Sequence, residues 1–180
     1  LLPFSVSSAF NYIFNGVSFS LAAYASRVHI TGANADAVIV STNGATFGVV
    51  QYSQGSVCDG STNTDPESIT IFPESTWISD YTFSCSTLLT TTAAGVTLVV
   101  DDAAGDRANF QIDGVPVAAT GWSIIGASTY KYIRIAVVPG PHRIINTNNK
   151  PFSFYQYAVG SAESYIVQGG ASFTNCLICN

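Results

Sequence analysis

Apolar residues and small polar residues alternate along several short segments of this chain. Clear examples are Val28–Thr31, Ser68–Ile71 and Tyr132–Val137. Successive side chains of a β-strand point to opposite faces, so each segment predicts a strand with one buried face and one hydroxylated face. In every window of about eleven residues, Gly, Pro or β-branched residues interrupt any series of apolar residues at helical spacing. The sequence therefore predicts almost no α-helix.

Turn signals return about every eight to twelve residues, which is typical of β-sandwiches and barrels rather than of alternating strands and helices. Asn43-Gly44 and Asp113-Gly114 each lie between two alternating segments and predict two-residue hairpins with type I′ turns. We therefore expect an all-β fold: an antiparallel β-sandwich, immunoglobulin-like or jelly-roll-like, with almost no helix.

The chain has 180 residues, enough to bury a core without help from a metal. We expect an extended N-terminal arm over residues 1–15 and a single β-sandwich domain over residues 16–180. The polar, turn-rich stretch from Gly55 to Pro66 is a candidate boundary between two lobes. A surface loop anchored by a disulfide is an equally good interpretation.

Charged residues make up only 9% of the chain, and the formal net charge is -5. Nucleic-acid binding depends on Lys and Arg neutralising phosphates, so this composition argues against it. The longest apolar run, Phe19 to Ala25, is too short to cross a membrane. The chain contains no Met and begins Leu-Leu-Pro-Phe, which fits either a removed leader or a piece of a longer chain. We expect a secreted, extracellular protein.

The four cysteines are Cys58, Cys85, Cys176 and Cys179. An even number in a chain of this composition predicts structural disulfides. We favour pairing of Cys58 and Cys85 with Cys176 and Cys179, which would pin the C-terminal tail. Zinc binding and intermolecular bridges remain alternatives. A redox role is disfavoured because no helix is predicted after Cys176 to lower the thiol pKa.

Candidate catalytic and metal-binding groups are sparse. His29 and His142 are separated by most of the chain, and a metal site needs further ligands that converge on them. The one carboxylate cluster comprises Asp101, Asp102, Asp106 and Asp113. Its spacing differs from that of calcium-binding loops, so a solvated hairpin connection is the better interpretation. We expect no metal, no cofactor and no enzymatic activity.

Aromatic residues gather near the C-terminal end of the chain. On a strand, Phe152, Phe154 and Gln156 face one way, whereas Tyr155 and Tyr157 face the other. A half-wet aromatic face suits contact with a sugar or a protein. The predicted ligand platform consists of Trp122, Tyr155, Tyr157 and Tyr165. Packing under a neighbouring strand is the alternative.

The N-terminal arm alternates apolar and polar residues on a single parity, as expected for one long extended strand. In a monomer it is an ordinary first strand. In a polymer the arm is a donor strand that completes the sheet of a neighbouring subunit. Because such a contact does not close into a ring, repeated addition of subunits gives a filament. The predicted subunit-interface residues are Phe4, Val6, Phe10, Tyr12 and Phe14.

Several short motifs follow one another in an order that resembles the N-terminal type of domain of IgGFc-binding proteins. They are Phe72–Tyr81, Asp113-Gly114, Gly121–Ile125, Pro139–Ile144, Pro151–Tyr157 and Ser164-Tyr165, with a weaker match over Val28–Val50. The resemblance does not extend before Val17 or after Ala171. It implies an extracellular all-β adhesion module without enzymatic activity, and immunoglobulin binding does not carry over from the name.

Together these features predict an extracellular, non-enzymatic structural or adhesive protein. We expect it to associate with itself by strand exchange into fibres or larger assemblies. The alternative is a monomeric module that binds glycans or extracellular proteins through its exposed tyrosines.

Overall fold

The computed structural model describes residues 1–5, 8–31, 36–52, 67–85, 91–160 and 164–172. The strands of the N-terminal part are β1 (Leu2–Ser5), β2 (Phe10–Phe14), β3 (Val17–Leu21), β4 (Ile39–Ser41), β5 (Phe47–Tyr52) and β6 (Ser68–Ile71). The remainder comprises β7 (Asp80–Cys85), β8 (Thr91–Asp101), β9 (Phe110–Ile112), β10 (Val115–Pro116), β11 (Ser123–Ile124), β12 (Tyr130–Ala136), β13 (Gly140–Asn146), β14 (Ser153–Gly160) and β15 (Ser164–Gln168). Two short 3-10 helices, η1 (Glu74–Thr76) and η2 (Asp106–Asn109), are the helical elements of the described residues.

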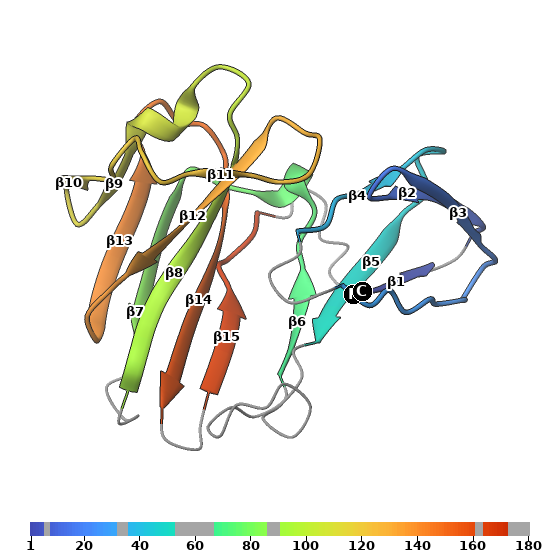
Figure 1. Ribbon diagram of the computed structural model, residues 1–180, viewed down its shortest axis with the longest axis horizontal. Helices are drawn as coiled ribbons and strands as arrows, with labels where there is room; N and C mark the ends of the chain where they lie inside the picture. Colours follow the sequence, from blue (N-terminus) through green and yellow to red (C-terminus); the bar gives the residue numbers. More distant parts are fainter. Residues whose placement is uncertain (6–7, 32–35, 53–66, 86–90, 161–163, 173–180) are drawn as a thin grey trace, which may run out of the picture.

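Two antiparallel sheets form a sandwich in the C-terminal part (Figure 1). One sheet has the order β10-β9-β13-β7 and the other β11-β12-β8-β14-β15. Their facing sides enclose a core of nine buried residues: Tyr81, Val96, Leu98, Val100, Phe110, Ile133, Ile144, Phe152 and Phe154. The predicted antiparallel β-sandwich with almost no helix is confirmed.

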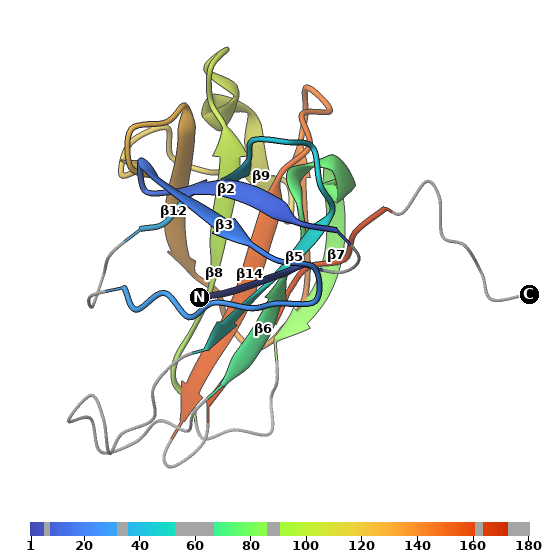
Figure 2. The same ribbon diagram turned by 90° about the vertical axis from the view of Figure 1, so that its right-hand side faces the viewer.

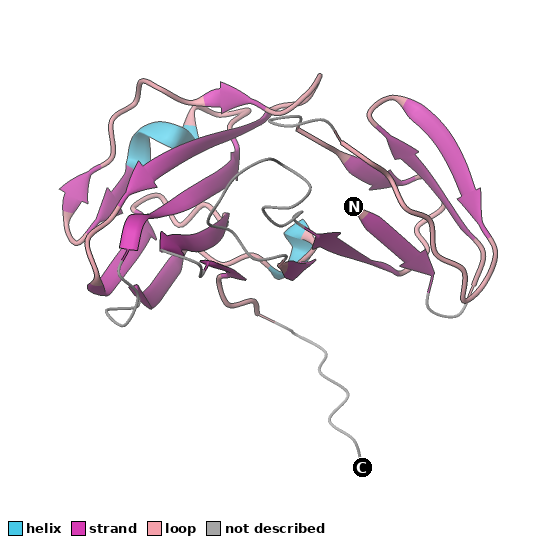
Figure 3. Cartoon of the chain, turned by 60° about the horizontal axis from the view of Figure 1, so that its bottom comes forward, coloured by secondary structure: helices cyan, strands magenta, loops and turns pink. Residues whose placement is uncertain are grey.

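The N-terminal strands form two further sheets, β1-β5-β6 and β3-β2-β4, which lie to one side of the sandwich (Figures 1 and 3). In the view turned by 90°, these two sheets lie in front of the sandwich (Figure 2). Phe10, Tyr12 and Leu21 form a second buried cluster, separate from the sandwich core. The candidate lobe boundary at residues 55–66 lies outside the described residues.

Two predicted hairpins have opposite outcomes. Asp113-Gly114 joins β9 to β10, and both residues have positive φ as a type I′ turn requires. The prediction of a hairpin at Asn43-Gly44 is wrong, because β4 pairs with β2 while β5 pairs with β1 and β6. The Asn43 side chain instead accepts a hydrogen bond from the Asn11 N–H and donates one to the Ala9 carbonyl. Contacts made across the fold thus override the local turn signal.

Gly169 and Gly170 follow β15, and neither has a positive φ. A Cβ atom at Gly169 would overlap the ring of the core residue Phe154, whereas one at Gly170 would meet nothing within 4 Å. The close approach of the chain to Phe154 therefore requires glycine at position 169 only.

We predict that Gly169→Ala lowers the free energy of unfolding by about 1–3 kcal/mol, because the methyl group displaces Phe154 from a packed core. Gly170→Ala is the matched control and should change it by less than about 0.5 kcal/mol. Urea denaturation of both variants measures the difference. Equal effects of the two substitutions would show that Phe154 does not constrain Gly169.

His142 is a buried residue of β13. It lies beside Asp113, which belongs to the turn between β9 and β10. Its Nδ1 lies 2.7 Å from Asp113 Oδ2 and its Nε2 lies 2.7 Å from the Val138 carbonyl oxygen. Burial alone lowers the pKa of His142, but these two acceptors outweigh it and raise the pKa above the ordinary value of 6.5. The folded protein therefore binds this proton more tightly than the unfolded chain does.

A raised folded-state pKa stabilises the protein fully below the unfolded pKa, and the effect is lost as the pH rises through the folded pKa. We predict that His142→Gln costs more free energy of unfolding at about pH 5.5 than at about pH 8.5. Urea denaturation of both proteins at the two pH values tests this. Asp113→Asn should weaken the same pH dependence, and a cost independent of pH would contradict the assignment.

Candidate functional site

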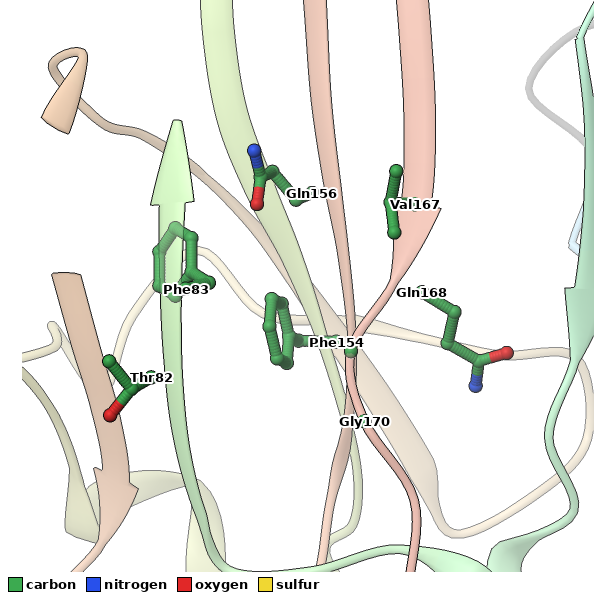
Figure 4. Close-up of a pocket in the computed structure, with 8 residues that line it drawn as sticks. Thr82, Phe83, Phe154, Gln156, Val167, Gln168 and Gly170 are labelled. Atoms are coloured by element: carbon green, nitrogen blue, oxygen red, sulfur yellow. The ribbon is translucent and has the colours of Figure 1, made fainter. Parts of the chain in front are cut away.

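One side of the sandwich has β7 of the first sheet opposite β14 and β15 of the second. A hollow of about 200 Å³ opens there (Figure 4). Phe83 and Phe154 form its aromatic wall, with ring centroids 5.2 Å apart. The full lining is Thr82, Phe83, Phe154, Gln156, Val167, Gln168, Gly169 and Gly170. None of these side chains is charged, so the hollow suits an uncharged group.

Among the strands that the structure describes, β7 pairs with β13 alone, so it lies at the edge of its sheet. The Asn146 N–H donates to the Ser79 carbonyl at 2.9 Å, and from there every second residue of β7 turns its main-chain groups to β13. Thr82 and Ser84 occupy the alternate positions. Their main-chain N–H and C=O groups therefore point away from β13, along the open side of the sandwich.

Gln156 spans part of this opening from β14. Its Nε2 donates to the Ser84 carbonyl at 2.9 Å and to the Tyr165 hydroxyl at 2.7 Å. The main-chain N–H and C=O of Thr82 have no hydrogen-bond partner among the described residues. An unpaired edge beside an uncharged hollow can accept an extended chain, whose main chain would pair with Thr82 while one side chain enters the hollow.

The predicted ligand platform is distributed over different faces. Tyr155 and Tyr157 lie on the side of β14 that is turned away from the core. The ring and hydroxyl of Tyr157 pack over Gly95 there. Trp122 packs on the core residue Phe110, with ring centroids 5.4 Å apart. Tyr165 meets Gln156, whose side chain points between the sheets. The structure thus brings Tyr155 and Tyr157 together without the other two, and ligand binding by this set stays a prediction.

The alternation predicted one long strand over the N-terminal arm. The structure instead has two strands there, β1 and β2. β1 and β2 belong to different sheets, and Val6 lies outside the described residues. Phe10 stacks on Phe47 at 4.4 Å, and the Tyr12 hydroxyl hydrogen-bonds His29 at 2.7 Å. Phe10 and Tyr12 are therefore buried against residues of their own chain.

The other predicted interface residues also have contacts within the chain. Phe14 stacks on His29 at 4.1 Å, and the ring of Phe4 lies over Gly48 of β5. β1 is hydrogen-bonded on both sides: it pairs with β5, and the Arg27 N–H donates to the Pro3 carbonyl at 3.1 Å. It therefore fills a slot between β5 and the segment 25–29.

Cys85 is buried at the end of β7. Burial raises the pKa of its thiol, against a smaller opposite effect of a hydrogen bond with Tyr165. Cys58, Cys176 and Cys179 lie outside the described residues, so the predicted disulfides stay a prediction.

The acidic residues of the predicted cluster are paired with basic groups. Asp102 contacts both Arg107 and Lys131, and Lys150 lies 3.3 Å from Asp101 and 3.9 Å from Asp106. Asp113 pairs with His142, far from His29 in the other cluster. No group of three or more His, Cys, Asp or Glu residues within the described chain is placed to hold a metal ion.

Sequence reasoning missed the open side of the sandwich. Alternation in Asp80–Cys85 marks a strand with Tyr81 and Phe83 on one face, but the pattern carries no information on which strand ends a sheet. Thr82 and Gly169 are separated by about half of the chain and line one hollow only in the folded structure.

A search for membrane-spanning helices and three comparisons with known proteins complete the description of this chain. No helix in the described part of the chain is long and apolar enough to cross a membrane. A comparison with curated proteins and one with solved structures found no match. The family model described as IgGFc binding protein matches residues 15–175, which is most of the chain. Its domains are binding or structural modules of extracellular type and are not a known enzyme family. The chain therefore belongs to the IgGFc binding protein family.

Proposed function

We propose that this chain is a secreted, non-enzymatic adhesion module that binds an extended segment of another protein along the open edge of β7. The observation that carries the proposal is the main chain of Thr82, whose outward groups have no partner within the described parts of the chain, beside the hollow walled by Phe83 and Phe154. Strand addition combines main-chain hydrogen bonds with a pocket for one side chain, so it recognises shape more than charge. The low charge of the chain agrees with such a contact.

A second candidate function is assembly of the chain with copies of itself by exchange of β1. It is favoured by the slot that β1 fills between β5 and residues 25–29, with hydrogen bonds on both sides. The same segment of a second copy would make the same contacts, so exchange between chains costs little in contact energy. Phe4 is then the exchanged aromatic anchor, while Phe10, Tyr12 and Phe14 stay in the cluster of their own chain.

We predict that Thr82→Pro abolishes binding of an extended peptide at the open edge. Proline removes the outward N–H without touching the ladder to β13, and edge strands tolerate it. Thr82→Val keeps the N–H and should bind as the wild type does. The probe is a capped peptide of threonines with one central phenylalanine, titrated into the full chain by NMR.

The same titration with alanine in place of the phenylalanine tests the hollow. Burial of a phenylalanine side chain contributes about 1.5–3 kcal/mol, so the alanine peptide should bind at least about tenfold more weakly. Equal binding of both peptides, or full binding to Thr82→Pro, would exclude this edge as the site.

Exchange of β1 predicts that removal of residues 1–5 abolishes self-association, because the exchanged strand is then missing. A synthetic peptide of residues 1–5 should occupy the vacated slot and keep the shortened chain monomeric. Sedimentation velocity of both proteins measures the change. Self-association that survives the deletion unchanged would rule out exchange of β1.

The extracellular assignment also predicts disulfides that use all four cysteines. Cys85 is buried within the sandwich, so a bridge from it to Cys176 or Cys179 would tie the C-terminal segment to β7. Mass-spectrometric peptide mapping without reduction should recover that link and a second one to Cys58. Four free thiols in the secreted, folded protein would contradict the prediction.

A further inference from the structure

A second hollow, of about 410 Å³, lies beside η1, away from the open edge of β7. Its lining consists of Glu74, Ser75, Trp77, Lys150 and Pro151. These residues come from two distant segments, the η1 region and the turn before β14. The sandwich therefore brings one aromatic ring and three polar side chains to a single surface.

Trp77 is the aromatic residue in the lining of this hollow. Its indole N–H donates to the Phe72 carbonyl at 3.3 Å, which holds the ring in place and uses up its only donor. The ring of Tyr130 meets it edge-on, with centroids 6.1 Å apart and planes at 80°. Trp77 thus offers a ligand a fixed ring face rather than a hydrogen bond.

The polar groups around this ring carry both charges. The Tyr130 hydroxyl donates to the Glu74 carboxylate and orients it. Lys150 Nζ lies 3.3 Å from Asp101 Oδ2 and 3.9 Å from Asp106 Oδ2, so its charge is already balanced. An anion would meet the carboxylate of Glu74 here, and a cation would meet the ammonium of Lys150. The surface favours a neutral ligand that both donates and accepts hydrogen bonds.

We propose that this hollow binds a pyranose ring of a neutral glycan. A pyranose has one face of C–H groups and a rim of hydroxyls. The C–H face packs on Trp77, as apolar groups do on a ring that is partly exposed to water. The hydroxyls donate to the Glu74 carboxylate and accept from Lys150 Nζ, and the Ser75 hydroxyl lies within the same lining. This site shares no residue with the predicted tyrosine platform or with the open edge of β7.

The chain offers a direct reporter, because its only tryptophans are Trp77 and Trp122. Trp122 packs on Phe110 elsewhere in the sandwich and donates to the Ala118 carbonyl at 3.1 Å. In the full-length Trp122→Phe variant, all tryptophan fluorescence therefore comes from Trp77. The probes are the methyl glycosides of glucose, galactose, mannose, N-acetylglucosamine and N-acetylgalactosamine, with tetramethylammonium and sulfate as ionic comparisons.

We expect at least one glycoside to change the fluorescence of Trp122→Phe with saturation, and neither ion to do so. Saturation-transfer NMR on the otherwise unchanged chain gives a second measure that does not depend on the reporter. Trp77→Ala should weaken binding about tenfold or more, and Trp77→Phe should weaken it less because it keeps a ring. Glu74→Gln, which keeps the acceptor oxygen but not the charge, should lie between them. Thermal unfolding of each variant establishes that it is folded.

Three outcomes would overturn the proposal. They are the absence of saturable binding by every glycoside, undiminished binding by a folded Trp77→Ala, and tighter binding of tetramethylammonium or sulfate than of any glycoside. The Thr82→Pro variant should bind the glycoside normally, which separates this site from the peptide site on β7.

Discussion

Tyr81 links the two sheets of the sandwich, in the chain segments that border both candidate surfaces. Its hydroxyl donates to the Phe152 carbonyl at 2.7 Å and accepts the Ile78 N–H at 3.0 Å. Its ring meets those of Phe152 and Phe154 edge-on, at 4.9 and 4.8 Å. A buried hydroxyl that has both a donor and an acceptor partner avoids the cost of an unsatisfied polar group. Tyr81 therefore anchors β7 to β14 at one level of the sandwich.

The contacts between the sheets differ along β7. At Ile78 the chain bridges to Phe152, and the sandwich is closed. Further along, at Thr82, the outward main-chain groups have no hydrogen-bond partner among the described residues, and the side chain of Gln156 reaches across to Ser84. Tyr81 thus lies between the bridge at Ile78, near the Trp77 hollow, and the part of β7 that borders the hollow beside Thr82.

The N-terminal strands have their own source of stability. Tyr12 and Phe14 surround His29, whose pKa is lowered by burial and by the nearby charges of Arg27 and the N-terminus. A neutral imidazole can accept or donate one hydrogen bond without the cost of burying a charge. Because this cluster is separate from the sandwich core, exchange of β1 would leave the sandwich undisturbed.

Short-range patterns in the sequence determined the all-β class, the hairpin at Asp113-Gly114 and the inward face of Phe152 and Phe154, because a period of two and a two-residue turn are local properties. The same patterns failed at Asn43-Gly44, where β2 and β1 compete successfully for the neighbouring strands. The partner of each strand, the open edge at Thr82, and the meeting of Trp77 with Tyr130 were decided only by the tertiary structure. Alternation specifies which side chains are buried on a strand, but it contains no information on which strand lies at an edge or on which distant segment covers it.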